Sequence, residues 1–230
     1  MRRSGSRPDT SEGIAFIQNQ NQKSVDEISA HIYERKEQEI IDQTEAGLED
    51  PNTNVYSLFN DFVMFGDSRV YGYITTGALD PSRVLADGGA TIHNIPDYLS
   101  VIEQLRPKNI FLSYGVNDMG LEIGSEEGGY GAQYEAEINK LLEIVPQANI
   151  YVNSIIPAQP FRVETSPSWG NVDAYNEEIK KMCKRNKWHF IDNDPLADGG
   201  NANIYQEDGV HFLFDFYPVW ARHMLEATIS

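Results

Sequence analysis

Five short apolar runs that alternate with amphipathic segments most restrict how this 230-residue chain can fold. Between the runs, apolar residues recur at helical spacing, as at Tyr134, Ile138 and Leu141. Strands that alternate with helices build βαβ units, so the pattern predicts an α/β fold with a parallel sheet and helices on both faces. The predicted strands are residues 62–65, 83–86, 109–114, 149–155 and 188–191.

The N-terminal part has a different pattern. Residues up to about Ser24 are polar and rich in Gln and Asn, which predicts a tail or linker. Ser24 and Glu27 have the spacing of a capping box, and the apolar residues that follow predict a long, charged helix to about Gly47. We expect this helix to pack on the outside of the domain, with a partner-binding or membrane-proximal stalk as the alternative.

No internal repeat and no second core are visible in the sequence. We therefore divide the chain into residues 1–55, a tail and accessory helix, and residues 56–230, one domain. The oligomeric state is left open by the sequence.

The composition excludes some classes of partner. A formal net charge of -17 argues against nucleic acid, because phosphate binding needs clustered Lys and Arg. The same charge disfavours anionic membrane surfaces and highly acidic substrates, and it favours solubility. The single cysteine, Cys183, allows no intrachain disulfide, and no Cys/His cluster has the spacing of a zinc site.

No apolar run in the sequence is long enough to span a bilayer. Residues 1–4 begin like the basic part of a signal peptide, but no apolar segment follows them. If the natural protein is exported, its leader or anchor lies outside this chain.

Polar residues and glycines follow the predicted strands. Ligands of such a sheet bind outside the carboxyl ends of its strands, so these positions are candidates for chemistry. Each has an ordinary structural explanation, such as a helix cap or a turn. Taken together they predict one acyl-transfer site, built from Ser68, Gly89, Asn117, Asp208 and His211.

The residue types fit acyl transfer by a serine nucleophile. Ser68 needs a base, which His211 can supply, and Asp208 can fix the tautomer of that imidazole. The developing oxyanion needs hydrogen-bond donors. We expect them to be the backbone N–H groups of Ser68 and Gly89 and the side-chain amide of Asn117.

These segments resemble the four blocks of the SGNH (GDSL-type) hydrolase superfamily. The blocks are Gly66-Asp67-Ser68, Gly89, residues 115–118 and residues 208–211, and the resemblance covers about residues 61–227. Arg69 departs from the familiar motif, which has Leu there. The resemblance implies a three-layer α/β/α, flavodoxin-like fold, hydrolysis of esters, and no metal or organic cofactor. We expect a secreted or cell-surface location, with the leader or anchor absent from this chain, and the cytoplasm as the alternative.

The expected substrate is a small-molecule or glycan ester with a short acyl group. The loop of residues 157–170 contains the candidate substrate-binding residues Phe161, Arg162 and Trp169. No long apolar acyl tunnel or lid helix is visible, which favours acetyl over a lipid chain. The resemblance then implies removal of acetyl groups from a carbohydrate or cell-envelope glycan.

Three alternatives remain open at this stage. An O-acyltransferase would use the same triad with a sugar as the acceptor in place of water. A non-catalytic glycan-binding or scaffold module would keep only the fold. A metal hydrolase would gather Asp67, Asn117, Asp208 and His211 around one ion.

Overall fold

A five-stranded parallel sheet forms the centre of the structure, a computed structural model that describes residues 10–20, 25–125 and 128–229. Its strand order is β2-β1-β3-β4-β5, and every neighbouring pair is parallel. This is the 2-1-3-4-5 order of flavodoxin-like folds, so the predicted fold class is confirmed. The strands are β1 (Phe62–Gly66), β2 (Val84–Ala86), β3 (Asn109–Ser113), β4 (Asn149–Asn153) and β5 (His189–Ile191).

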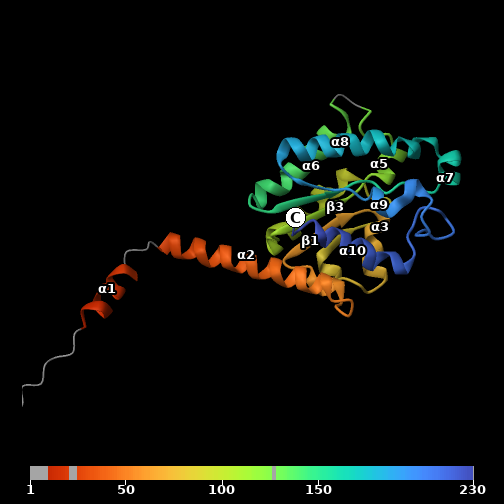
Figure 1. Ribbon diagram of the computed structural model, residues 1–230. Helices are drawn as coiled ribbons and strands as arrows, with labels where there is room; N and C mark the ends of the chain where they lie inside the picture. The colour runs from red at the N-terminus through yellow and green to blue at the C-terminus, as the bar shows by residue number, and fades with distance from the viewer. Residues whose placement is uncertain (1–9, 21–24, 126–127, 230) are drawn as a thin grey trace, which may run out of the picture. The chain divides into compact units, whose positions relative to one another are not determined.

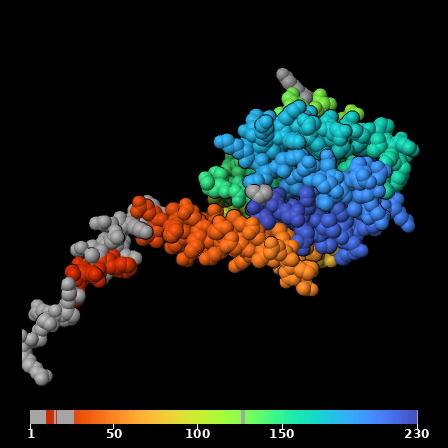
Figure 2. Space-filling view, viewed as in Figure 1, coloured from red at the N-terminus to blue at the C-terminus, as the bar shows by residue number. Residues whose placement is uncertain are grey.

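Two layers of helices cover the sheet (Figure 1). On one face lie α4 (Leu99–Leu105), α6 (Gly129–Ile144) and α8 (Val172–Asn186). On the other face lie α3 (Ser68–Thr75) and α10 (Tyr217–Glu226). Helices α8 and α10 also form much of the surface that Figure 2 shows.

The two cores explain why the strands are continuous apolar runs. Val63 and Phe65 point into the core under α4, α6 and α8, whereas Met64 points into the core under α3 and α10. Successive side chains of a strand face opposite sides of the sheet, so a sheet covered on both faces needs apolar residues at every position.

Short helices occupy several connections that the sequence left without structure. The stretch 157–170, expected as a loop, contains α7 (Pro160–Thr165) and part of η4 (Pro167–Asn171), and each begins with a proline at its first position. The other connecting elements are η1 (Val55–Leu58), η2 (Pro81–Arg83), η3 (Ile92–Tyr98), α5 (Val116–Gly120), α9 (Asp194–Ala197), η5 (Asp198–Gly200) and η6 (Phe214–Phe216).

The N-terminal part contains α1 (Ser11–Gln20) and α2 (Val25–Glu49). Helix α1 lies inside the predicted tail. The polar composition of this segment gave no helical pattern, although it includes the apolar residues Ile14 and Phe16, which are both exposed. The predicted N-cap Ser24 lies outside the described residues. Contacts divide the chain into a unit that ends at Gln43 and one that begins at Thr44. The boundary at residue 55 stays a prediction.

The last turn of α2 belongs to the second unit. Leu48 packs against the core under α3 and α10, and its carbonyl accepts a hydrogen bond from Arg222. Among the described helices, none combines the length and the apolar composition needed to cross a bilayer. The expected secreted or cell-surface location stays a prediction.

The contact between α3 and α10 gives a first test. A Cβ added to Gly72 would lie 1.6 Å from Tyr217 Oη, which donates a hydrogen bond to the Arg69 carbonyl at 3.0 Å. We expect Gly72→Ala to lower the free energy of unfolding by about 1–3 kcal/mol, because overpacking displaces the tyrosine. Urea denaturation measures the change. Gly88→Ala is the control, since no atom lies within 4 Å of its added Cβ. Equal stability of both variants would contradict this packing.

Candidate active site

Ser68 is the first residue of α3 and follows β1 after a tight turn. Gly66 has no room for a side chain, because a Cβ there would lie 2.2 Å from Val70 Cγ2. Asp67 is buried and caps α3, with Oδ1 accepting the Arg69 N–H at 2.9 Å. Burial raises the pKa of Asp67, although the charge of Arg69 opposes the rise. The packing at Gly66 and the cap at Asp67 thus explain the residue types that precede Ser68.

His211 lies between Ser68 and Asp208. Its Nε2 is 2.9 Å from Ser68 Oγ, and its Nδ1 is 2.5 Å from Asp208 Oδ2. Burial alone would raise the pKa of Asp208, but hydrogen bonds from the imidazole and from the backbone of Val210 and His211 outweigh it and lower that pKa. An ionised Asp208 accepts a hydrogen bond from Nδ1–H, which leaves Nε2 unprotonated and able to accept the proton of the serine hydroxyl.

Asn117 stands in α5, directly beyond β3. Its Nδ2 donates a hydrogen bond to the Ala90 carbonyl at 3.0 Å, which fixes the orientation of the amide. A side-chain amide carries two N–H donors, so one remains for a ligand. Gly115 precedes this helix with φ +139°, and a Cβ there would lie 2.2 Å from Ile155 Cδ1. Only glycine fits that close approach.

Gly89 lies on the exposed turn after β2. Its φ of +78° favours glycine, and no heavy atom lies within 4 Å of the position that a Cβ would take. A substrate can therefore approach its backbone closely. Gly89 is absent from the residues that line the pocket described below, and its role as an oxyanion donor stays a prediction.

Asp118 is fully buried and ties two strand exits together. Its Oδ1 accepts the Ile92 N–H at 3.0 Å, which joins the segment after β3 to the segment after β2. Its Oδ2 has no hydrogen-bond partner among the described residues, and burial raises its pKa to about 6. In the sequence it was indistinguishable from a residue of an ordinary turn or cap.

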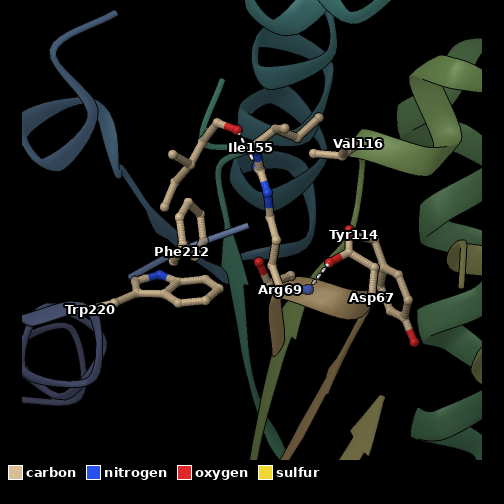
Figure 3. Close-up of a pocket in the computed structure, with 9 residues that line it drawn as sticks. Asp67, Arg69, Tyr114, Val116, Ile155, Phe212 and Trp220 are labelled. Atoms are coloured by element: carbon tan, nitrogen blue, oxygen red, sulfur yellow. Dashed lines mark hydrogen bonds between the residues drawn. The ribbon is translucent and has the colours of Figure 1, made fainter. Parts of the chain in front are cut away.

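Arg69 is also buried, and the sequence showed it only as a departure from the familiar motif. Its Nε donates to the Val210 carbonyl at 2.9 Å, and other guanidinium nitrogens donate to the carbonyls of Ile156 and Pro157. The guanidinium carbon lies 4.8 Å from the centre of the Phe212 ring (Figure 3). Burial lowers the pKa of Arg69. One side chain therefore connects the Ser68 turn to the segment after β4 and to the His211 loop.

A pocket of about 170 Å³ opens at these residues. Of the candidate substrate-binding residues, Arg162 and Trp169 line it. Phe161 is not among its lining residues and is close to Gly209, 2.6 Å from the position of an added Cβ. Within the described part of the chain, no group of three or more His, Cys, Asp or Glu side chains is placed to hold a metal ion. The pocket is lined by Asp67, Ser68, Arg69, Val116, Asn117, Arg162, Trp169, Asp208, Val210 and His211.

Comparison with known proteins identifies the class. The family model of the GDSL-like lipase/acylhydrolase family matches residues 64–213. The chain therefore belongs to this family and is a carboxylic ester hydrolase, as the resemblance in the sequence implied. No curated protein sequence matches the chain.

Solved structures share the fold at low identity. A proposed acylhydrolase of Bacteroides fragilis has a TM-score of 0.58 and 18% identity, over 80% of this chain and 93% of that one. A GDSL-like lipase of Bacteroides thetaiotaomicron has a TM-score of 0.57 and 17% identity, over 75% and 93%. The acetylxylan esterase Axe2 of Geobacillus stearothermophilus has a TM-score of 0.53 and 18% identity, over 73% and 93%. At these identities the likeness shows the fold alone.

The buried Arg69 gives a second test. In Arg69→Met, the Val210 and Ile156 carbonyls lose their donor, and each buried unpaired acceptor costs about 1–3 kcal/mol. We expect the free energy of unfolding to fall by about 2–4 kcal/mol. Arg83→Met is the control, because Arg83 is partly exposed, its ion pair with Asp61 contributes at most about 1 kcal/mol, and it donates to one backbone carbonyl, that of Phe62. Denaturant titration of both variants measures the difference, and equal losses would contradict the role of Arg69.

Asp118 predicts a pH dependence. Its folded-state pKa of about 6 exceeds the ordinary 3.8, so the folded protein binds this proton more tightly than the unfolded chain. The Asp118 carboxyl contributes stability below about pH 4, and this contribution is lost as the pH rises through about 6. The total loss in the free energy of unfolding is roughly 3 kcal/mol. Asp118→Asn removes the carboxylate, so the variant should gain stability relative to wild type between pH 4 and 7. Thermal unfolding across that range tests this against Asp215→Asn, at an exposed position. A pH-independent difference for Asp118→Asn would contradict it.

Proposed function

We propose that this hydrolase cleaves short-chain esters, acetyl esters above all, of a carbohydrate or cell-envelope glycan through a Ser68–His211–Asp208 triad. The observation that carries the proposal is the position of His211, with one ring nitrogen 2.9 Å from Ser68 Oγ and the other 2.5 Å from Asp208. Nucleophile, base and orienting carboxylate meet at one pocket.

In the proposed first half-reaction, Ser68 Oγ attacks the carbonyl carbon of the ester while His211 Nε2 takes the hydroxyl proton. The imidazolium keeps its Nδ1–H bonded to Asp208. When the tetrahedral intermediate collapses, the carbon–oxygen bond to the alcohol breaks and Nε2 returns the proton to the leaving oxygen. An acyl group then remains on Ser68.

In the second half-reaction, a water molecule gives its proton to His211 Nε2 and attacks the acyl carbon. Collapse of this intermediate breaks the bond to Ser68 Oγ, which recovers the proton from Nε2. The carboxylic acid leaves, and the site returns to its starting state.

Three donors are proposed for the oxyanion of both intermediates. Ser68 stands at the first position of α3, and the cap oxygen of Asp67 accepts from Arg69, so it does not occupy the Ser68 N–H. Asn117 offers the amide N–H that it does not use on Ala90. Gly89 offers a backbone N–H on an exposed turn, where no described heavy atom lies within 4 Å of the position of an added Cβ.

The size of the pocket supports a short acyl group. A volume of about 170 Å³ that opens on Trp169 fits a small acyl group and part of a sugar better than a long lipid chain. The indole face of Trp169 suits a sugar, because the apolar face of a sugar ring packs against an aromatic ring. The shared fold of the acetylxylan esterase of Geobacillus stearothermophilus is consistent with this substrate class.

The triad predicts a steep loss of activity on substitution. Ser68→Ala should lower kcat/KM for 4-nitrophenyl acetate by roughly 10,000-fold or more, and Asp208→Ala should cost less because His211 can still act as a base. Unchanged thermal unfolding shows that the variants fold. Ser100→Ala, at an exposed position of α4, is the control and should keep full activity. Retained turnover by Ser68→Ala would rule out Ser68 as the nucleophile.

The same assay with longer acyl chains tests the acyl group. We expect kcat/KM to fall from acetate to butyrate to octanoate, because the pocket is small. Added oligosaccharide distinguishes hydrolysis from transfer: an acyltransferase would pass the acetyl group to the sugar, whereas the proposed esterase releases acetate.

A further inference from the structure

Arg162 is the candidate residue that the proposed chemistry leaves unexplained. It lies on α7, is half-buried, and lines the pocket together with Ser68 and His211. Its Nε is buried and has no hydrogen-bond partner among the described residues. The guanidinium carbon lies 5.5 Å from the centre of the Trp169 ring.

The described ion pairs include none with Arg162. Arg83, Arg185 and Arg35 each lie near a carboxylate, which is Asp61, Glu135 and Glu39 respectively. The sequence contains 35 Asp and Glu against 18 Lys and Arg, so carboxylates are abundant. An arginine that lines the pocket and has no carboxylate partner among the described residues keeps guanidinium donors for a ligand.

The stem of Arg162, in contrast, is held in place. Its Cγ lies 3.0 Å from the position that a Cβ on Gly209 would take, and Trp169 packs against the guanidinium. Gln159 N–H donates to the Gly209 carbonyl at 2.9 Å, which joins the start of α7 to the His211 loop. A side chain with a fixed stem, and with a head group that lacks a carboxylate partner among the residues described, is preorganised to bind an anion.

The position of Arg162 indicates which half of the ester it meets. Its stem contacts Gly209, between Asp208 and His211, so it lies on the side of the base. His211 protonates the leaving alcohol in the proposed mechanism. Asn117, one of the proposed oxyanion donors, comes from a different strand exit, beyond β3. Arg162 is therefore next to the alcohol half.

We propose that Arg162 binds an anionic group, a carboxylate or a phosphate, on the alcohol half of the ester, while Trp169 packs against the ring that carries it. The substrate class is then an acetyl ester of an acidic sugar, and this inference rests on the proposed function. A guanidinium matches the two oxygens of such a group with two parallel hydrogen bonds.

Because the formal net charge of the protein is -17, an anionic ligand needs a local positive charge such as Arg162 to bind in this pocket. The overall field of the protein disfavours the approach of a highly acidic ligand. Binding of an anionic group then depends on a positive charge inside the pocket, where screening by water is reduced.

Three small esters test the inference. Methyl 4-acetoxybenzoate is neutral, 4-acetoxybenzoate adds a carboxylate, and 4-acetoxyphenyl phosphate adds a phosphate to the alcohol half. The measured quantity is kcat/KM for each anionic ester divided by kcat/KM for the neutral ester. Because each ratio is compared between variants, differences in the intrinsic reactivity of the esters cancel.

We expect Arg162→Met, which keeps an apolar stem against Gly209, to lower at least one ratio by roughly tenfold or more. Arg162→Lys should fall between Met and wild type, since it keeps the charge but not the planar fork. Arg185→Gln removes one positive charge from α8, away from the pocket lining, and should leave both ratios as in wild type. The ester whose ratio falls more identifies the anion as carboxylate or phosphate.

Equal ratios in wild type and Arg162→Met, with the neutral ester turned over normally, would overturn the role of Arg162 and leave the proposed esterase activity intact. An equal fall of both ratios in Arg185→Gln would attribute the effect to net charge and would also overturn it. No turnover of any of the three esters by wild type would overturn the proposed function and this inference together.

Discussion

The structure depends on the parallel arrangement of its five strands, because that arrangement places every carboxyl end at one edge of the sheet. Ser68 follows β1 and Asn117 follows β3, two strands that are direct neighbours in the sheet. The loop with Asp208 and His211 comes later in the chain and reaches the same edge. Residues separated by up to 143 positions in sequence thereby meet within hydrogen-bonding distance. The helix layers on both faces exclude water from the strands, so the described pocket lies beyond the carboxyl ends of the strands and not on a face of the sheet.

Two buried charged side chains hold that edge in register. Arg69 connects the Ser68 turn with the carbonyls of Ile156 and Val210, and Asp118 connects the segments after β2 and β3. Neither residue takes part in the proposed bond-making steps. Buried polar groups of this kind are expensive to leave unpaired, so each hydrogen bond restricts how far the loops can separate. Distances such as the 2.9 Å between His211 Nε2 and Ser68 Oγ therefore depend on side chains outside the proposed triad.

The proposed chemistry and the proposed specificity use different parts of the pocket. The proposed triad and oxyanion donors come from the carboxyl edge of the sheet and from the His211 loop, and they suit any small ester. Arg162 and Trp169 come from α7 and η4, the short helices after β4. Variation in such a connection changes the ligand without disturbing the sheet, because loops carry few of the core contacts. The inference about an acidic sugar ester concerns only this second part.

The sequence by itself determined the five strands, the long helices between them and the residue types of the proposed triad, since these depend on local periodicity and on short motifs such as Gly66-Asp67-Ser68. It did not determine the burial of Arg69 or Asp118, because burial depends on which distant carbonyls and N–H groups fold against a side chain. It also missed α1 and treated residues 157–170 as a loop, since polar or irregular segments carry little periodicity. Only the tertiary structure separated Arg162, which lines the pocket with no described hydrogen-bond partner for its Nε, from Phe161, which packs near Gly209. The physical reason is that orientation and partners belong to the folded chain, whereas residue type belongs to the sequence.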